Sequence, residues 1–336
     1  MDINYEIGTK LARNGKFKES YRYLIESVEQ NNADAANDLG VVFEHMDNYK
    51  LALDFYKKAI KLGSVAAIYN VGNLYENGLG VHMDFNKAKQ FYERAAKLNY
   101  SNAYHKLSKL YYYGMGVERD YDKSFKLLED GQVLEDKNDY ANTYCITSLA
   151  HRYFRGEGVD KDVKKAYDLW KLAARHGNIW AMYNVAVGML FGDQMPKDPD
   201  TAIKTFIRLA IDEGCGDAMR ILWKIFERGE FVKKNLFEAG SWILRSASNG
   251  DPAAFLKIAL ICLSGRDKRY GFKAGCLEKA IVDFNIATFG KEMEYIEEIN
   301  VYKKLRERYP DKIDWDYLET MPNLKEKRDN KDICSC

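Results

Sequence analysis

The sequence predicts an all-α fold, an α/α superhelical solenoid of helix-turn-helix repeats, from three observations. A Gly-x-Gly-Val loop begins at Gly78, recurs 36 residues later at Gly114, and returns at Gly156. Apolar residues at helical spacing flank every copy. The chain of 336 residues contains only 5 prolines, which favours helix throughout. A unit that recurs every 20 to 50 residues or so is typical of solenoids, in which each unit stacks on its neighbours.

Each loop is followed at a constant distance by an acidic or amide residue that precedes a second apolar helical pattern. Asp and Asn are preferred N-cap residues because their side-chain oxygens accept hydrogen bonds from the free amides of the first turn. Pro199, directly after Asp198, suits the first position of a helix. Weaker copies of the loop begin at Gly192 and Gly229, and about six extra residues lie around 133–140. The expected N-cap residues are Asp84, Asp120, Asp162, Asp198 and Asn235.

The Gly-x-Gly motif also occurs in phosphate-binding loops, but those follow a β-strand and occur once in a domain. Here a helical pattern precedes the loop and the loop recurs, so we predict a structural turn. The first glycine is expected to end the first helix in a left-handed conformation, and the second to reverse the chain. Small residues such as Gly72, Ser108, Ala88 and Ser124 are expected where the two helices of a repeat approach closely.

The complete pattern, an aromatic and small-residue helix followed by Gly-x-Gly-Val and Asp, resembles the Sel-one-like repeat family, a relative of the tetratricopeptide repeats. The resemblance is strongest over residues 65–177. It implies Sel-one-like repeats over residues 65–250, and two plain tetratricopeptide-like repeats over residues 1–64, which lack the Gly-x-Gly insertion. Residues 251–310 are expected to form a degenerate repeat and a capping helix, and residues 311–336 a flexible charged tail that ends in Cys-Ser-Cys.

Composition excludes several partners and locations. The formal net charge is +1 with acids and bases interspersed, so we expect no binding to nucleic acid. Because the Gly-x-Gly loop is predicted to be a structural turn, we also expect no cofactor. No apolar run reaches the length of about 18 residues that a membrane span needs, and the N-terminus has no signal-peptide pattern. The six cysteines show no regular pairing, as expected of reduced thiols in a cytoplasmic protein.

The family resemblance implies a non-catalytic scaffold or adaptor, because stacked helix pairs leave a concave surface that can hold a peptide or a partner helix. In the related tetratricopeptide geometry, fixed positions of the first helix of each repeat line that surface. These positions are rich in aromatic and basic residues, which are frequent in binding hot spots. The alternative for any single ring is that it packs against the next repeat. The expected partner-binding residues are Tyr69, Asn73, Glu76, His105, Lys109, Tyr112, Tyr113, His151, Phe154, Arg155, Trp180, Tyr183, Arg220 and Lys224, with Thr147 in the same register.

Two other functions stay open at this stage. Cys334 and Cys336 end the chain in a Cys-x-Cys pattern similar to that of doubly lipidated small GTPases, so a membrane-tethered adaptor is the first alternative. A β-lactam hydrolase of the cysteine-rich repeat type is the second, although those relatives carry a cysteine pair in every repeat. The chain has no recognised catalytic motif, and its five histidines are spread about one per repeat. The sequence therefore predicts neither an enzyme nor a metal site.

Overall fold

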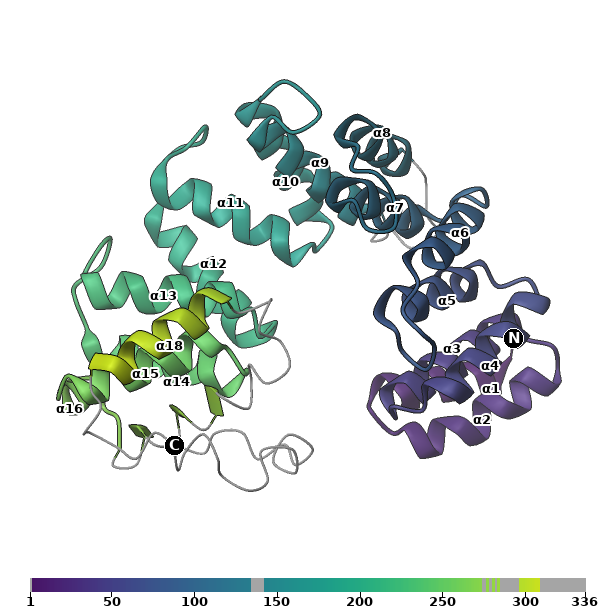
Figure 1. The fold of residues 1–336 in the computed structure, drawn as a ribbon, viewed down its shortest axis with the longest axis horizontal. Coiled ribbons are helices and arrows are strands. Elements are labelled where there is room, and N and C mark those ends of the chain that lie inside the picture. The colour runs from purple at the N-terminus through teal and green to yellow at the C-terminus, as the bar shows by residue number, and fades with distance from the viewer. Residues whose placement is uncertain are drawn as a thin grey trace. The chain divides into compact units, whose positions relative to one another are not determined.

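The computed structural model describes residues 2–133, 142–273, 276–277, 280–281, 283–284 and 296–308. Within these ranges the regular structure is helical and contains no strand (Figure 1). Backbone contacts divide the chain into two units, residues 1–182 and residues 183–336. The helices of the first unit are α1 (Ile3–Arg13), α2 (Phe17–Glu29), α3 (Ala33–His45), α4 (Tyr49–Lys61), α5 (Val65–Asn77), α6 (Phe85–Ala96), α7 (Ser101–Tyr113), α8 (Tyr121–Gln132), α9 (Thr143–Arg155), α10 (Val163–Arg175) and the start of α11 (Ile179–Phe191).

Successive helices of the first unit form hairpins, and the hairpins stack on one another. α1 packs on α2, α3 on α4, α5 on α6, α7 on α8 and α9 on α10 (Figure 1). The second helix of each hairpin also packs on the first helix of the next, as α4 does on α5 and α6 on α7. This arrangement confirms the predicted solenoid of helix-turn-helix repeats.

The glycine loop ends the first helix of the repeat as predicted. Gly78 follows α5 with a φ of 66° and donates its N–H to the carbonyl of Leu74. Gly80 also has a φ of 66°, and a Cβ added there would lie 2.6 Å from the Cβ of Tyr49 in the preceding repeat. A left-handed backbone and so close a contact both require a residue without a Cβ, which confirms the structural role of the loop.

The weaker copies of the loop keep the turn without its second glycine. Gly192 and Gly229 have φ values of 76° and 75°, as expected of glycines that end a helix. At the second place Gln194 and Phe231 adopt φ values of 53° and 68°, a region that bulky residues seldom enter. The Phe231 ring packs edge-on against Phe191, with 5.8 Å between the ring centroids. Tertiary contacts therefore accompany the turn where the sequence motif has been lost.

The predicted N-caps begin the second helices. The Asp84 carboxylate accepts a hydrogen bond of 2.9 Å from the backbone N–H of Lys87, in the first turn of α6. This bond satisfies one of the amides that have no partner within the helix. The same bond, to the N–H three residues on, is made by Asp120, Asp162, Asp198 and Asn235.

Two successive hairpins of the first unit match a glycine on the first helix to a large ring on the second. A Cβ added to Gly72 of α5 would lie 2.6 Å from Cε1 of Tyr92, which is fully buried in α6. A Cβ added to Gly40 of α3 would lie 2.3 Å from Cε1 of Tyr56 in α4. The two helices therefore approach closely at the predicted small residues, and the tyrosine rings fill the space.

The next hairpin uses different residues at the same places. α7 carries Ser108 where α5 carries Gly72, and α8 carries Leu128 where α6 carries Tyr92. The Ser108 and Ser124 hydroxyl oxygens lie 2.8 Å apart, and both side chains are buried. A larger first-helix residue is thus combined with a shorter second-helix residue, which confirms the predicted close approach at Ser108 and Ser124.

The second unit continues with hairpins and a short turn. α14 packs on α13, α15 and α16, and α13 also packs on α12. A Cβ added to Gly240 of α14 would lie 2.0 Å from the carbonyl oxygen of Tyr270 in α16, so this helix crosses α14 at a glycine. The helices of this unit are α12 (Pro199–Asp212), α13 (Gly216–Arg228), α14 (Leu236–Ser248), α15 (Pro252–Leu263), α16 (Asp267–Tyr270) and α18 (Ile296–Arg308).

Helix α18 (Ile296–Arg308) lies within residues 251–310, where the sequence predicts a degenerate repeat and a capping helix, and it packs on α15. Tyr302 and Leu305 of α18 are buried, and the Tyr302 ring stacks on Phe284 with 5.0 Å between the ring centroids. Among the described helices, none combines the length and the apolar run that crossing a bilayer requires. The predicted tail over residues 311–336, with Cys334 and Cys336, lies outside the described residues.

Candidate functional site

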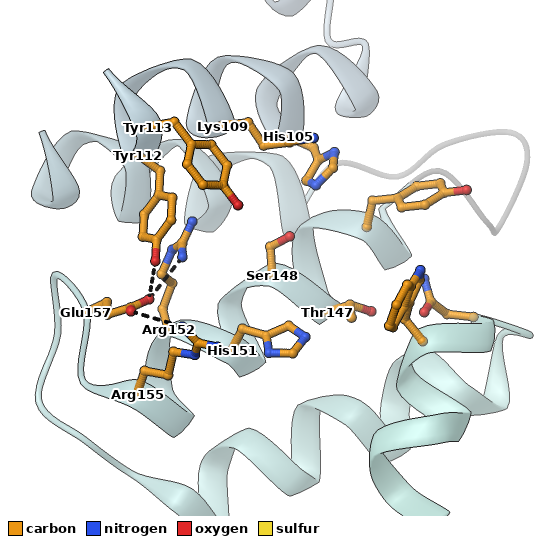
Figure 2. Close-up of a pocket in the computed structure, with 13 residues that line it drawn as sticks. His105, Lys109, Tyr112, Tyr113, Thr147, Ser148, His151, Arg152, Arg155 and Glu157 are labelled. Atoms are coloured by element: carbon orange, nitrogen blue, oxygen red, sulfur yellow. Dashed lines mark hydrogen bonds and ion pairs between the residues drawn. The ribbon is translucent and has the colours of Figure 1, made fainter. Parts of the chain in front are cut away.

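A pocket of about 460 Å³ lies between α7 and α9 in the first unit and extends to the start of α11. Figure 2 shows the labelled α7 side chains facing those of α9 across the hollow. Its size is in the range of small-ligand and side-chain sites, about 300–1,000 Å³. We call it the α7–α9 pocket. It is lined by His105, Lys109, Tyr112, Tyr113, Tyr144, Thr147, Ser148, His151, Arg152, Arg155, Glu157, Asn178 and Trp180.

The α7–α9 pocket brings together predicted binding residues from three successive repeats. Trp180, at the start of α11, is 53% exposed and Tyr113, at the end of α7, is 61% exposed. More than half of the surface of each residue is therefore accessible to a ligand. The predicted residues that line the pocket are His105, Lys109, Tyr112, Tyr113, Thr147, His151, Arg155 and Trp180.

Three predicted residues of α5 do not line the pocket and instead contact other residues of the solenoid. They are Tyr69, Asn73 and Glu76. The Tyr92 hydroxyl donates to Asn73 Oδ1 at 2.8 Å and also hydrogen-bonds to the Glu76 carboxylate. Lys106 Nζ lies 2.9 Å from Glu76 Oε2, in an ion pair that joins α5 to α7. The Tyr69 ring lies 5.7 Å from that of Tyr92. These three predicted residues therefore make contacts within the solenoid.

Phe154 of α9 faces the second helix of its own repeat. Its ring lies 5.4 Å from that of Trp170 and 6.3 Å from that of Tyr167, both in α10. It is absent from the lining of the pocket, although its sequence neighbour Arg155 is present. Adjacent residues of α9 therefore face different ways, Phe154 toward α10 and Arg155 toward the pocket.

Tyr183, Arg220 and Lys224 belong to the second unit, where they line a separate hollow of about 300 Å³. The Tyr183 ring packs edge-on against Phe206 at 5.6 Å. Arg220 Nη2 forms an ion pair of 2.9 Å with Asp217 Oδ1. This hollow has its own basic residues, but they are largely matched by neighbouring acids.

The sequence did not predict five lining residues, Tyr144, Ser148, Arg152, Glu157 and Asn178. A signal for Tyr144 was present, because Tyr144 is the second residue of α9 and Trp180 the second residue of α11. The two rings therefore occupy equivalent places 36 residues apart. No comparable signal was present for Arg152, because core residues occupy its position in other repeats.

Arg152 is an arginine at a buried place in the repeat. It is the tenth residue of α9 and only 8% exposed. A charge is rarely buried unless it is paired. At the same place four other first helices, α3, α5, α7 and α13, carry Val42, Leu74, Leu110 and Ile225, all buried.

Glu157 and Tyr112 hold the Arg152 guanidinium. Arg152 Nη1 lies 3.2 Å from Glu157 Oε2, and the guanidinium carbon lies 3.5 Å from the centroid of the Tyr112 ring. The Tyr112 hydroxyl donates to Glu157 Oε2 at 2.9 Å (Figure 2). Arg155 Nη1 lies 3.6 Å from Glu157 Oε1. One carboxylate is therefore shared by two arginines and a phenol at this end of the pocket.

The pocket carries more positive than negative charge. Lys109, Arg152 and Arg155 face a single acid, Glu157, among the residues that line it. Burial, with the nearby charges of Lys109 and Lys106, lowers the pKa of His105 to about 4. Both histidines of the pocket are therefore neutral near pH 7, since burial and the two arginines also lower the pKa of His151.

Two polar atoms of the pocket lining have no hydrogen-bond partner among the described residues. They are Oγ1 of Thr147 and Nε of Arg152, on side chains that are buried in α9. Buried polar groups normally have a partner, and both atoms are buried, so a ligand or water would reach them only after a shift of the neighbouring side chains. His105 and His151 line the same pocket, but within the described ranges no group of three His, Cys, Asp or Glu residues could hold a metal ion.

The low pKa of His105 predicts a loss of stability in mild acid. The unfolded imidazole has a pKa of about 6.5, so between that value and about 4 the unfolded chain binds more protons than the folded one. The free energy of unfolding should therefore fall as the pH falls through this window, by about 1–2 kcal/mol between pH 7 and pH 5 for this partly exposed ring. Urea unfolding at both pH values measures it.

The matched variants for this test are His105→Asn and, as a control, His82→Asn at an exposed position. His105→Asn should flatten the pH dependence by that amount, while His82→Asn should leave it as in the wild type. Equal pH dependence in all three proteins would contradict the effect of the pocket charges on His105.

A Sel1 repeat family model matches more than half of the chain. It includes residues 33–64, for which the sequence predicted a plain tetratricopeptide-like repeat, and residues 224–251 in the second unit. The matched ranges are 33–64, 65–100, 101–129, 144–178, 181–210 and 224–251.

Solved structures and a curated protein are also similar to the chain. The Sel1 repeat protein from Oxalobacter formigenes is 26% identical, with a TM-score of 0.59 over 71% of this chain and 96% of that one. Yeast Tom70 shares the fold at 17% identity, with a TM-score of 0.52 over 93% of this chain and 61% of that one. The ERAD-associated E3 ubiquitin-protein ligase component HRD3 of Candida glabrata is 42% identical over 67 residues, 20% of this chain and 8% of that protein.

The chain therefore matches only a small part of the length of the curated relative. The fold, the glycine turns and the repeat matches agree with the resemblance predicted from the sequence. The chain belongs to the Sel1 repeat family.

Proposed function

We propose that the chain is a non-catalytic scaffold that holds a segment of a partner protein in the α7–α9 pocket. Repeat proteins of the Sel1 and tetratricopeptide type generally mediate protein–protein interaction. Their stacked hairpins present the first helices of successive repeats side by side, which suits an elongated ligand. The similarity of a short stretch to a component of a ubiquitin ligase is consistent with a role in a multiprotein assembly.

The observation that carries this proposal is the buried Arg152. Its place in the repeat is otherwise apolar, and a buried ion pair contributes little net stability compared with apolar residues of similar size. A charge kept at a core place, beside a pocket and with a donor that lacks a partner, therefore favours a role in binding. Packing alone accounts for Leu110 at the same place of α7, but not for Arg152.

Exposed rings at the rim of the pocket support the same proposal. Tyr113 is 61% exposed, Trp180 53% and Tyr144 51%. Tyrosine and tryptophan bury a large area with few rotatable bonds, which is why they are enriched at interface hot spots. The proposal includes a protein rather than a nucleic acid as partner, no enzymatic activity, and the cytoplasmic location that the unpaired cysteine pattern predicts.

The rings give a direct test. Replacing Trp180 and Tyr113 together by alanine should weaken capture of the partner at least about ten-fold, since each is a candidate hot spot. The fold should remain, because both side chains are more than half exposed. Quantitative affinity capture from the native cell, followed by binding of the purified partner, measures the effect, with circular dichroism and the melting temperature of each variant recorded in parallel.

The control is Leu98→Ala, which removes an equally exposed apolar side chain (53%) outside the pocket. It should capture the same partner as the wild type. If every captured protein binds the double variant as strongly as the wild type, the proposed binding site is wrong.

A further inference from the structure

The α7–α9 pocket is polar at one end and aromatic at the other. Tyr144 is the second residue of α9, while Arg152 and Arg155 are its tenth and thirteenth. Helical rise places the backbone of Tyr144 and Arg155 about 16 Å apart along one helix. The Tyr144 ring stacks on His105 at 5.7 Å, near the start of α7, and Tyr112 near its end contacts Arg152. The charged contact between the two helices thus lies toward the C-terminal end of both.

The charged end has unused capacity for an anion. Glu157 satisfies part of two guanidinium groups, but Nε of Arg152 has no partner among the described residues. Arg155 is 64% exposed at its side chain, and Lys109 forms no ion pair with any described residue. Two positive charges therefore remain after the one carboxylate is counted, with the histidines neutral.

Glu157 also indicates which anion suits this end. Its carboxylate accepts hydrogen bonds from Arg152 and from the Tyr112 hydroxyl, and pairs with Arg155. Arginine binds carboxylates with directed N–H donors, so the cluster already shows the geometry that a second carboxylate would use. An aromatic or apolar side chain has its counterpart at the other end, where Tyr144 and Trp180 are exposed.

We infer that the pocket recognises an internal segment of a partner protein that carries an Asp or Glu side chain for the Lys109, Arg152 and Arg155 end and an aromatic side chain for the Tyr144 and Trp180 end. The inference rests on the proposed function and adds the chemistry of the partner. An extended chain rises about 3.3 Å per residue, so the two side chains stand about five residues apart in the segment. The charge surplus of the pocket, in a protein whose net charge is only +1, supplies the selectivity.

The test uses synthetic peptides and the full-length chain. Each fluorescein-labelled peptide is a Gly/Ser chain with both termini blocked that carries one Glu and one Trp, at spacings from about two to about eight residues. Fluorescence anisotropy gives the dissociation constants. We expect the tightest binding near a spacing of five, at least about ten-fold weaker binding when Glu is replaced by Gln, and weakening with added salt.

Paired variants connect the preference to the residues. The Lys109→Gln, Arg155→Gln double variant should bind the Glu peptide no better than the wild type binds the Gln peptide. Lys97→Gln, which removes an exposed lysine outside the pocket, should change nothing. Both pocket side chains are at least partly exposed, so the double variant is expected to fold, and its melting temperature checks this.

The outcomes separate the inference from the proposed function. Equal binding of the Glu and Gln peptides, or no saturable binding of any peptide below about 1 mM, would overturn the inference and leave partner capture through Trp180 and Tyr113 in place. A preference of more than about ten-fold for phosphoserine over Glu would overturn the assignment to Asp or Glu. Partner capture that survives the Trp180 and Tyr113 substitutions would remove the proposed function and the inference with it.

Discussion

Gly72→Ser is expected to lower the free energy of unfolding by about 2–3 kcal/mol, although serine has the better helix propensity of the two residues. A Cβ at this place would lie 2.6 Å from Cε1 of Tyr92, inside van der Waals contact. The ring has little freedom to withdraw, because its hydroxyl is bonded to Asn73 and Glu76 and the side chain is fully buried. Urea unfolding followed by circular dichroism measures the change.

A second substitution should restore much of the loss. The next hairpin combines Ser108 with Leu128 at the places of Gly72 and Tyr92. Gly72→Ser with Tyr92→Leu copies that combination, so the double variant should be more stable than the sum of the single effects predicts. Gly216→Ala is the control, since a Cβ there meets no atom within 4 Å. Additive effects at Gly72 and Tyr92 would contradict the matched packing.

Glu157→Met is expected to cost about 3 kcal/mol, because it leaves Arg152 without its carboxylate partner. The Arg152 side chain is 10% exposed, so water replaces the lost partner poorly. The Tyr112 ring stays beside the guanidinium, but its cation–π contact replaces only part of the stabilisation that the carboxylate provides. The free energy of unfolding in urea, compared with that of the wild type, measures the loss.

Removing both charges should cost far less than removing one. Arg152→Leu with Glu157→Met places at these positions the residues that the preceding repeat carries as Leu110 and Met115, and it should unfold at about the wild-type urea concentration. The same variant should fail to bind the Glu peptide, which would separate binding from folding.

The control is Glu230→Met. Glu230 pairs with Arg228 at 3.6 Å in the equivalent loop of the second unit, but both side chains are more than half exposed. Replacing Glu230 should therefore change the free energy of unfolding by less than about 0.5 kcal/mol. If Glu157→Met is equally neutral, Arg152 is not the buried cation described here.

The fold was predictable because its signals are local and repeated. Gly78 and Asp84 act within a few residues of themselves, one by ending a helix and one by beginning the next. Repetition at a fixed interval then makes a weak motif specific. The turn at Phe231 shows the limit of such signals, since a residue with no local reason for a left-handed backbone adopts one.

The sequence predicted the site only in part. The position of a residue in the repeat determines on which face of the helix it lies, but not which neighbouring side chains cover that face. Tyr69, His105 and Tyr183 are each the fifth residue of their first helix. Tyr69 packs on Tyr92 within the solenoid, whereas His105 lines the α7–α9 pocket. The difference lies in neighbours that are distant in sequence, and one helical period carries no information about them.

The pairing of a glycine with a large ring in two successive hairpins has a consequence for how such a chain can change. Gly40 and Tyr56 lie in one hairpin, and Gly72 and Tyr92 in the next, so each fitted pair travels with its own unit. A whole unit can be duplicated or deleted with its fit intact, while a crossover between the two helices of a unit separates the pair. Growth and shortening of the array by whole units is therefore the tolerated route, and recombination within a unit the costly one.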